Sequence, residues 1–203
     1  MEFFVRIIRK SLGARALVEG PNFYFGHNRE GTVERLAQLS SAAGISLDIV
    51  PPVVIDGDIV SSSRVRDLIR DGKVEQAAKL LSSPYRIRGM VTHGAGRGAK
   101  IGFPTANLSA VDTLLPALGV YAGRAQISGG IYPAAINLGP SPTFGDAMIR
   151  VEVHMIGLDD ALYGQPLEVD FVARLRDIRP FDSPAALIEQ LNLDIEQVKR
   201  ITK

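Results

Sequence analysis

The pattern of residues changes abruptly at Ser82-Ser83-Pro84, and this change limits the chain to two differently built parts. Before it, helical and strand-like patterns alternate, which is typical of a parallel α/β unit. After it, short β-like runs are separated by glycine and proline turns, which predicts a small barrel or sandwich. We therefore expect an α+β chain with one domain over residues 1–81 and a second over residues 82–203.

The first part carries helical patterns and two strand-like ones. Apolar residues recur at helical spacing, and capping residues and glycines stand where helices are expected to begin and end. The expected helices cover residues 3–12, 32–43, 61–71 and 74–81, and the expected strands cover residues 15–19 and 45–50. Because two strands are few for a doubly wound sheet, this part is expected to be an incomplete α/β unit.

The second part consists mainly of short alternating runs between turns. The expected strands cover residues 85–92, 120–127, 132–137, 150–155 and 167–175. A final helix is predicted after Asp182-Ser183-Pro184, where a capping residue precedes a first-turn proline. This helix has an apolar stripe that we expect to be buried, and the stripe consists of Leu187, Leu191, Ile195 and Val198.

Composition narrows the class of protein. Of the 203 residues, 46% are apolar and 22% are charged, and the formal net charge is +1. This balance provides no general attraction to nucleic acid or to a membrane surface. Cysteine is absent, which excludes disulfides and thiolate zinc sites and fits a reducing compartment. No secretory signal or membrane-length apolar run is found, so we expect a cytoplasmic protein.

The chemically richest segment runs from His93 to Asn107. Its glycines allow the backbone to approach a ligand and to turn N–H groups toward phosphate oxygens, and two basic residues add positive charge. The glycines are Gly94, Gly96, Gly98 and Gly102, and the basic residues are Arg97 and Lys100. Glycine richness is equally typical of a flexible hairpin loop, so a phosphate-binding loop and a plain loop both stay open at this point.

The end of this segment, Pro104-Thr105-Ala106-Asn107, favours the first interpretation. Thr105 and Asn107 stand two positions apart, so their side chains share one face of an extended segment. Each offers a neutral oxygen, and Mg²⁺ binds such oxygens together with phosphate and water. The alternative is that both residues cap backbone groups in a turn after the proline.

A second candidate is the run Val151-Glu152-Val153-His154, which alternates as a strand does. Glu152 and His154 therefore share one face. A carboxylate on a rigid strand can orient a substrate hydroxyl and accept its proton during phosphoryl transfer, and His154 could assist. The alternatives are a solvated cross-strand partner for the glutamate and a structural role for the histidine.

A third candidate lies at the start of an expected helix, where three serines precede Arg64-Val65-Arg66. Helix N-termini favour anions, and Ser62, Ser63 and Arg66 are placed to form a phosphate cradle there. A plain helix cap with spare serines explains the same residues equally well.

These motifs together carry a resemblance to a known family. Residues 82–181 resemble the riboflavin kinase (flavokinase) domain of bacterial bifunctional riboflavin kinase/FAD synthetases. The resemblance implies a six-stranded Greek-key-like β-barrel with a C-terminal helix. Its landmarks, in matching order and spacing, are Gly102-Phe103-Pro104-Thr105-Ala106-Asn107, Gly119-Val120-Tyr121-Ala122, the run from Asn137 to Gly145, Glu152-Val153-His154, Leu162-Tyr163-Gly164, and Leu175-Arg176-Asp177 followed by Phe181.

Residues 1–81 resemble the FMN adenylyltransferase module of the same proteins, which has a Rossmann-like α/β fold. Gly20 to Gly26 looks like the family's Gly-x-Asp-Phe-x-Phe-Gly segment, with Asn22 in place of the aspartate, and Ser61 to Arg66 looks like its Ser-Ser-x-x-x-Arg motif. The family's Gly-x-Phe-Asp-Gly-x-His-x-Gly-His segment is missing, and His27 is in no such pair. We therefore expect only the later half of this module, which makes FAD synthesis by this chain doubtful.

The resemblance implies transfer of the ATP γ-phosphoryl group to the 5′-hydroxyl of riboflavin, giving FMN. It implies Glu152 as the catalytic base and Thr105 and Asn107 as the contacts to Mg²⁺ and ATP. The nucleotide would also contact the Gly94–Gly102 loop, and the flavin would contact Asn137, Thr143, Phe144 and Arg176. Ser62, Ser63 and Arg66 would be a remnant phosphate motif. Two alternatives stay open: an adenylyltransferase acting on FMN, and a catalytically silent flavin-binding module.

Overall fold

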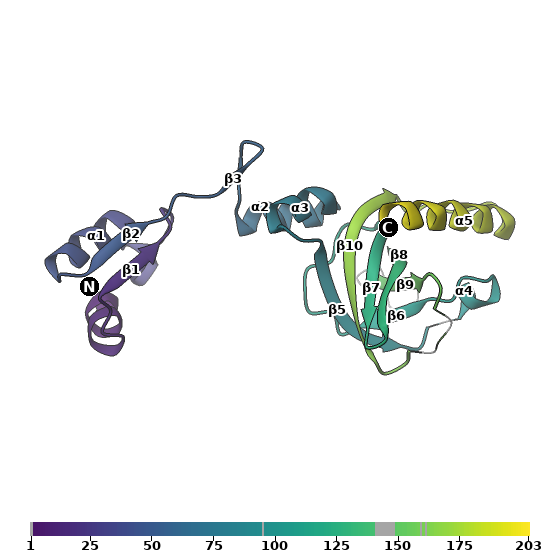
Figure 1. Ribbon diagram of the computed structural model, residues 1–203, viewed down its shortest axis with the longest axis horizontal. Coiled ribbons are helices and arrows are strands. Elements are labelled where there is room, and N and C mark those ends of the chain that lie inside the picture. Colours follow the sequence, from purple (N-terminus) through teal and green to yellow (C-terminus); the bar gives the residue numbers. More distant parts are fainter. Residues whose placement is uncertain (1, 95, 141–148, 159, 161) are drawn as a thin grey trace. The chain divides into compact units, whose positions relative to one another are not determined.

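The computed structural model describes residues 2–94, 96–140, 149–158, 160 and 162–203. The chain divides into two compact units, Met1–Val60 and Ser61–Lys203, and each is described by itself. Figure 1 labels their helices and strands. No helix within the described residues combines the length and the apolar character that crossing a membrane requires.

The first unit is a small α/β arrangement. Within residues 2–60, β1 (Ala16–Glu19) and β2 (Ser46–Ile49) form a parallel pair, and the chain between them contains α1 (Val33–Ala42). The side chain of Thr32 accepts a hydrogen bond from the N–H of Arg35 and so caps α1. The helix–strand alternation predicted from the sequence is confirmed.

The apolar core of this unit is small. The remaining elements are η1 (Phe4–Ser11), η2 (His27–Arg29), β3 (Val54–Ile55) and β4 (Asp58–Ile59). The buried core residues are Phe4, Phe25, Leu36 and Ile45. Phe4 comes from η1 and Leu36 from α1, so both helices are held to the unit by burial of their apolar faces.

In the described part of the second unit, six antiparallel strands close into a barrel in the order β10-β5-β6-β9-β8-β7 (Figure 1). The strands are β5 (Tyr85–Thr92), β6 (Ala106–Ser109), β7 (Gly119–Ile127), β8 (Gly130–Pro140), β9 (Ile149–Met155) and β10 (Pro166–Arg176). The run β10-β7-β8-β9 has the spatial order of a Greek key. The predicted barrel is therefore confirmed, and β6 is the strand that periodicity did not indicate.

Alternation along the strands fills the barrel with apolar side chains. Ile136, Val153 and Phe171, from three different strands, have no exposed surface, and the ring of Tyr121 meets Phe171 edge to face at 5.2 Å. The hydroxyl of Tyr121 donates a hydrogen bond to the carbonyl of Ala117 at 2.6 Å. Burial raises the pKa of this phenol above the ordinary tyrosine value.

The helices α2 (Ser62–Arg70) and α3 (Val74–Leu81) belong to the barrel unit. Their buried residues pack with Tyr85 of β5 and with Leu114, and Glu75 of α3 accepts a hydrogen bond from the backbone N–H of Arg174 at 2.9 Å. The compact units consequently meet at Val60 and Ser61, upstream of the 81/82 boundary expected from the sequence. Ser82-Ser83-Pro84 is a turn between packed elements.

Two further helices complete the unit. The predicted final helix is α5 (Pro184–Ile201), capped by Ser183, whose side chain accepts from the N–H of Ala186 at 3.2 Å; it lies against β7, β8 and β10 (Figure 1). The second is α4 (Arg97–Lys100), one helical turn within the glycine-rich segment. Gly96, with a φ of 66°, makes the left-handed turn that leads into α4.

Candidate functional site

Three neighbouring strands place polar side chains in one row. Asn107 on β6 pairs in register with Glu152 on β9, and Glu152 pairs in register with Asn137 on β8. Residues directly opposite each other on adjacent strands point to the same face of the sheet. Two amides thus flank one carboxylate at a position fixed by backbone pairing on both sides.

The carboxylate of Glu152 is held but remains reachable. The Nδ2 of Asn137 donates a hydrogen bond to Oε2 at 3.1 Å, and Nη1 of Arg150 lies 3.7 Å from Oε1. The side chain of Glu152 is 28% exposed, so it borders open space. A carboxylate held in this way can accept a proton from a hydroxyl placed beside it.

The glycine-rich segment packs closely against this row. A Cβ on Gly94 would lie 2.1 Å from Nδ2 of Asn107, and a Cβ on Gly98 would lie 2.3 Å from the carbonyl oxygen of Phe103. The carbonyl of Gly98 also accepts a hydrogen bond from the N–H of Phe103 at 2.9 Å. Glycine is therefore needed at Gly98, where the obstacle is backbone, whereas a side chain at Gly94 would displace the Asn107 side chain.

His154 fixes the segment that leads into β6. Its Nδ1 donates to the carbonyl of Pro104 across 2.8 Å, and its ring meets Phe103 edge to face at 5.8 Å between centroids. Thr105 follows directly after this tether. His154 thus both lines the cavity and holds the backbone at Pro104. The role in catalysis that the sequence suggested for it stays a prediction.

A cavity of about 480 Å³ lies beside the polar row, within the size range of small-molecule sites. One side of it is polar and is formed by Gly96, Arg97, Gly98, Thr105, Asn107, Asn137, Glu152 and His154. The other side is mainly apolar and is formed by Ile178, Phe181, Leu187, Leu191 and Ile195, with Arg176, Arg179 and Asp194 among them. The cavity therefore offers both polar and apolar contacts to a ligand.

The apolar side comes largely from α5. Leu187, Leu191 and Ile195 were expected to form a buried stripe, and they are half-buried and face the cavity. Val198, at the end of the stripe, is fully buried. The expectation of complete burial was therefore wrong for three of the four stripe residues, because the cavity separates that part of α5 from the barrel.

The sequence-predicted nucleotide residues divide into two groups. Gly96, Arg97, Gly98 and Thr105 line the cavity, whereas Gly94, Lys100 and Gly102 are not among its lining residues. Gly94 still contacts the site indirectly through Asn107. Lys100 is exposed at the end of α4, so its expected contribution of charge to the cavity lacks support from the geometry.

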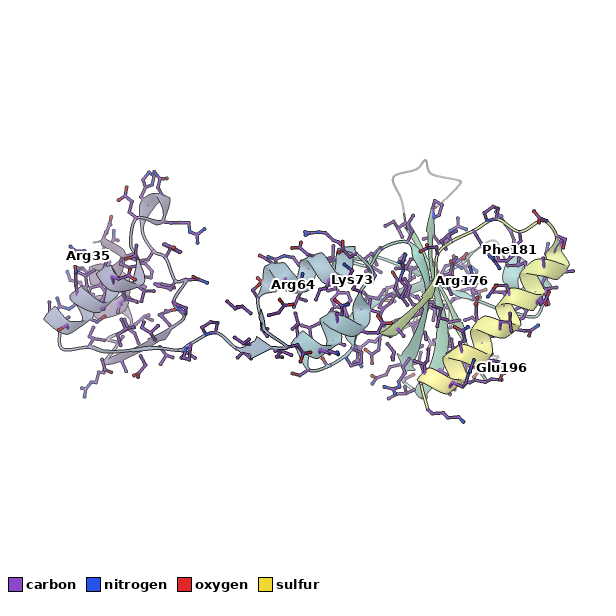
Figure 2. All side chains as sticks on the ribbon, turned by 90° about the horizontal axis from the view of Figure 1, so that it is seen from above. Arg35, Arg64, Lys73, Arg176, Phe181 and Glu196 are labelled. Carbon is purple, nitrogen blue, oxygen red and sulfur yellow. The ribbon has the colours of Figure 1, made fainter. Side chains whose placement is uncertain are left out.

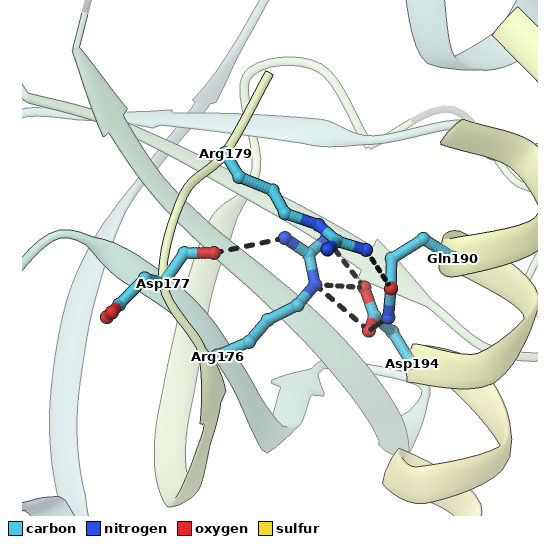
Figure 3. A network of polar contacts seen from close by, with 5 residues as sticks. All are labelled: Arg176, Asp177, Arg179, Gln190 and Asp194. Atoms are coloured by element: carbon cyan, nitrogen blue, oxygen red, sulfur yellow. Dashed lines mark hydrogen bonds and ion pairs between the residues drawn. The ribbon is translucent and has the colours of Figure 1, made fainter. Parts of the chain in front are cut away.

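Arg176 lines the cavity, but its charge is already compensated. A register shift in β10 falls between Arg174 and Arg176, and such bulges redirect side chains. The guanidinium of Arg176 lies against the buried carboxylate of Asp194 on α5 at 2.8 Å (Figure 3). Of the other predicted flavin contacts, Asn137 lines the cavity and donates to Glu152, while Thr143 and Phe144 lie outside the described residues.

The serine-rich helix start lies apart from this cavity. Ser61 caps α2 by accepting from the N–H of Arg64 at 3.2 Å, and Arg66 Nη2 donates to Ser63 Oγ at 3.4 Å. Ser62, Ser63 and Arg66 are exposed and do not line the cavity. A remnant phosphate motif there stays a prediction.

Sequence reasoning missed Asp194 and Arg150, which contact the predicted site residues Arg176 and Glu152. It also missed Gln190, which donates a hydrogen bond to Asp194. For Asp194 a signal was present, because it interrupts an apolar stripe between Leu191 and Ile195. A carboxylate on the inward face of a helix requires a partner. Gln190 and Arg150 carry no comparable signal in the sequence.

Comparisons with known proteins show the family of the chain. Residues 81–202 match the riboflavin kinase family (flavokinase), and residues 1–64 match the FAD synthetase family. The first match covers more than half of the chain, so the chain belongs to the riboflavin kinase family.

Among curated proteins, a bifunctional riboflavin kinase/FMN adenylyltransferase of Pseudomonas fluorescens is 33% identical over 201 residues, which are 98% of this chain and 65% of that protein. Its counterpart in Bacillus subtilis is 32% identical over 194 residues, which are 93% of this chain and 61% of that protein. The chain thus spans less than two thirds of the length of these relatives. A crystal structure of a macrolide-efflux protein from Streptococcus pneumoniae is also similar, with a TM-score of 0.88 and 37% identity, covering 98% of this chain and 64% of that one.

Proposed function

We propose that this member of the riboflavin kinase family transfers the γ-phosphoryl group of ATP to the 5′-hydroxyl of riboflavin, forming FMN and ADP. One observation carries the proposal: Thr105, Asn107 and Glu152 meet in a cavity that has the glycine-rich loop on one side and an apolar wall on the other. Phosphoryl transfer needs positioning and charge neutralisation more than covalent catalysis, and these residues are of the required kinds.

The polar side of the cavity is assigned to the nucleotide. Gly96 and Gly98 allow phosphates to approach the backbone, and Arg97 supplies positive charge beside them. Mg²⁺ in kinase sites takes one or two protein oxygens and otherwise phosphate oxygens and water. Thr105 and Asn107 fit that requirement with one hydroxyl and one amide oxygen, and the ion would neutralise charge on the transferred group.

Glu152 is assigned to the riboflavin hydroxyl. As the hydroxyl oxygen forms its bond to the γ-phosphorus, the bond from phosphorus to the leaving ADP oxygen breaks and Glu152 takes up the hydroxyl proton. Asn137 keeps the carboxylate oriented through its hydrogen bond to Oε2. The flat flavin ring would lie against the apolar side, where Phe181 and α5 exclude water.

The proposal is tested by incubating the purified chain with riboflavin, ATP and Mg²⁺ and separating the flavins. FMN that requires both ATP and Mg²⁺ is expected. Tight riboflavin binding without formation of FMN would contradict the proposed kinase activity and favour a catalytically silent flavin-binding module.

Adenylyl transfer to FMN is the second candidate, because residues 1–64 match the FAD synthetase family. The chain has three histidines, His27, His93 and His154, and none is in a His-x-Gly-His pair. FMN without FAD is therefore the expected outcome of the incubation. Formation of FAD from FMN and ATP by the same preparation would establish the second activity and contradict this expectation.

The variant Glu152→Gln tests whether Glu152 is the general base. General base catalysis contributes about 10²- to 10⁴-fold, so kcat should fall by that order while ATP binding persists. Glu196→Gln is the matched control, because it makes the same chemical change at an exposed site on α5 whose partner is Lys199. Equal turnover of Glu152→Gln and the unmodified chain would remove Glu152 as the base.

A further inference from the structure

Asp194 is a carboxylate buried where the barrel meets α5, and its side chain is only 2% exposed. An ionised carboxylate in such a place is costly unless it is paired and hydrogen-bonded. Arg176 donates to it from Nε, at 3.1 Å to each oxygen, and from Nη2, at 2.8 Å to Oδ2. Gln190 adds a hydrogen bond from Nε2 to Oδ1 at 2.8 Å (Figure 3). Both oxygens of the Asp194 carboxylate therefore accept hydrogen bonds from neighbouring side chains.

The same network holds the segment 177–183, which connects β10 to α5. Arg176 Nη1 donates to the backbone carbonyl of Asp177 at 3.2 Å, and Arg179 Nη2 donates to Gln190 Oε1 at 2.7 Å. Both guanidinium groups also lie over the ring of Phe181, at 5.7 and 5.1 Å from its centroid. Arg179 thereby ties the segment directly to α5, and Arg176, at the end of β10, holds both its first residue and Asp194 of α5.

This network lies at the apolar side of the cavity. Arg176, Arg179, Phe181 and Asp194 all line the cavity, and so do Leu187 and Leu191 of α5. Figure 2 shows Phe181 near the beginning of α5 and Glu196 farther toward its C-terminal end, while Arg176 reaches Asp194 in the later half of the helix. Phe181 is half-buried on an otherwise exposed connecting segment and is not part of the barrel core, so the two guanidinium groups that lie over its ring are contacts that can hold it in place.

We propose that Asp194 is a positioning residue for the flavin end of the cavity: through Arg176 and Gln190 it holds segment 177–183 and Phe181 in place as the wall against which the flavin ring binds. This inference rests on the proposed function for the identity of the ligand. It assigns Arg176 to support of this wall, because its guanidinium is bonded to the buried carboxylate of Asp194. Among the described residues, the hydrogen bonds of this network involve none of the side chains assigned to the nucleotide.

Asp194→Asn is the direct test, since it removes the charge and keeps the shape. Hydrogen exchange of the full chain without ligand should become faster in residues 177–183, and the KM for riboflavin should rise about tenfold, while the KM for ATP changes less than about twofold. Glu196→Gln, the same change in an exposed residue of the same helix with a side chain 65% exposed, should alter none of the three quantities. Arg176→Lys keeps the charge but loses the two-pronged geometry, and should show the same pattern as Asp194→Asn.

A folded Asp194→Asn variant with unchanged exchange in residues 177–183, or with equal rises in both KM values, would overturn the inference. If Asp194→Asn does not fold, Gln190→Leu is the second variant. It removes the hydrogen bonds from Gln190 to Asp194 and from Arg179 to Gln190 but leaves the ion pair between Arg176 and Asp194. This variant should raise the KM for riboflavin about threefold, and an unchanged KM would again overturn the inference. If the unmodified chain forms no FMN, the proposed function fails separately. Hydrogen exchange still decides whether Asp194 holds the segment.

Discussion

Replacing Gly98 by alanine should disrupt the loop on which the proposed nucleotide binding depends. A Cβ at this position would lie 2.3 Å from the carbonyl oxygen of Phe103, whereas ordinary contact distances begin at 3.4 Å. The obstacle is backbone and cannot turn aside as a flexible side chain would. One of the two backbone segments must therefore move by about 1 Å, because the surroundings are packed too closely to absorb the difference.

This movement sets the size of the expected effect. A displacement of about 1 Å within a catalytic site costs about 10²-fold in rate, so kcat/KM for ATP should fall by about 100-fold. Overpacking costs about 1–3 kcal/mol of stability, and each kcal/mol lowers the Tm of a chain of this size by about 2–4 °C. The variant should consequently stay folded at 25 °C with strongly reduced activity.

The assay is steady-state FMN formation with ATP varied at saturating riboflavin, together with thermal unfolding. Gly129→Ala is the matched control, because a Cβ there has no neighbour within 4 Å and its φ needs no glycine. Gly129 lies just after β7, which ends at Ile127. This control therefore does not alter the loop that contains Gly98. A folded Gly98→Ala variant with the kcat and KM of the unmodified chain would refute the reasoning.

Three further outcomes follow from the geometry. Asn137→Ala removes the hydrogen bond that orients Glu152 and should lower kcat about tenfold with little change in the KM for ATP; an unchanged kcat would contradict the orienting role. Tyr121→Phe leaves the carbonyl of Ala117 without its hydroxyl donor and should lower the free energy of unfolding, read from the urea midpoint, by about 1 kcal/mol. Burial raises the pKa of both Tyr85 and Tyr121 in the folded chain. The folded state therefore keeps these two protons to a higher pH than the unfolded state does. The stability that this difference contributes is present below a pH of about 10 and is lost as the pH rises further. The Tm should fall above that pH, and by less in Tyr85→Phe.

The strands that could be predicted are those whose own residues carry the pattern. In β9, Val151 and Val153 are buried while Glu152 between them is half-exposed, which is the alternation visible in the sequence. β6 has no such pattern: Pro104 and Asn107 are typical turn residues, and the segment is extended because it pairs with both β5 and β9. Long-range pairing of this kind is not written into any local stretch.

The site was predictable to the extent that its chemistry follows from residue type and spacing. Thr105, Asn107 and Glu152 could be singled out because two neutral oxygens and a strand-borne carboxylate are of the kinds that Mg²⁺ binding and proton transfer use, and the structure brings all three to one cavity. The ion pair between Arg176 and Asp194 could not be derived, because its partners lie 18 residues apart and meet only through the direction in which α5 returns across the barrel. The roles assigned to Thr143 and Phe144 stay predictions.

The position of β10 in the barrel has a consequence for how the chain is made. β10 is the last strand in the sequence, yet it pairs with both β5, the first barrel strand, and β7. Until residues 166–176 have left the ribosome, β5 and β7 must each present an unpaired edge, and closure then joins segments about 80 residues apart. Such distant contacts form slowly, and open edges favour association with other chains. Nascent chains arrested before Pro166 should therefore depend on chaperones, whereas chains released after Arg176 should close their barrel and escape them.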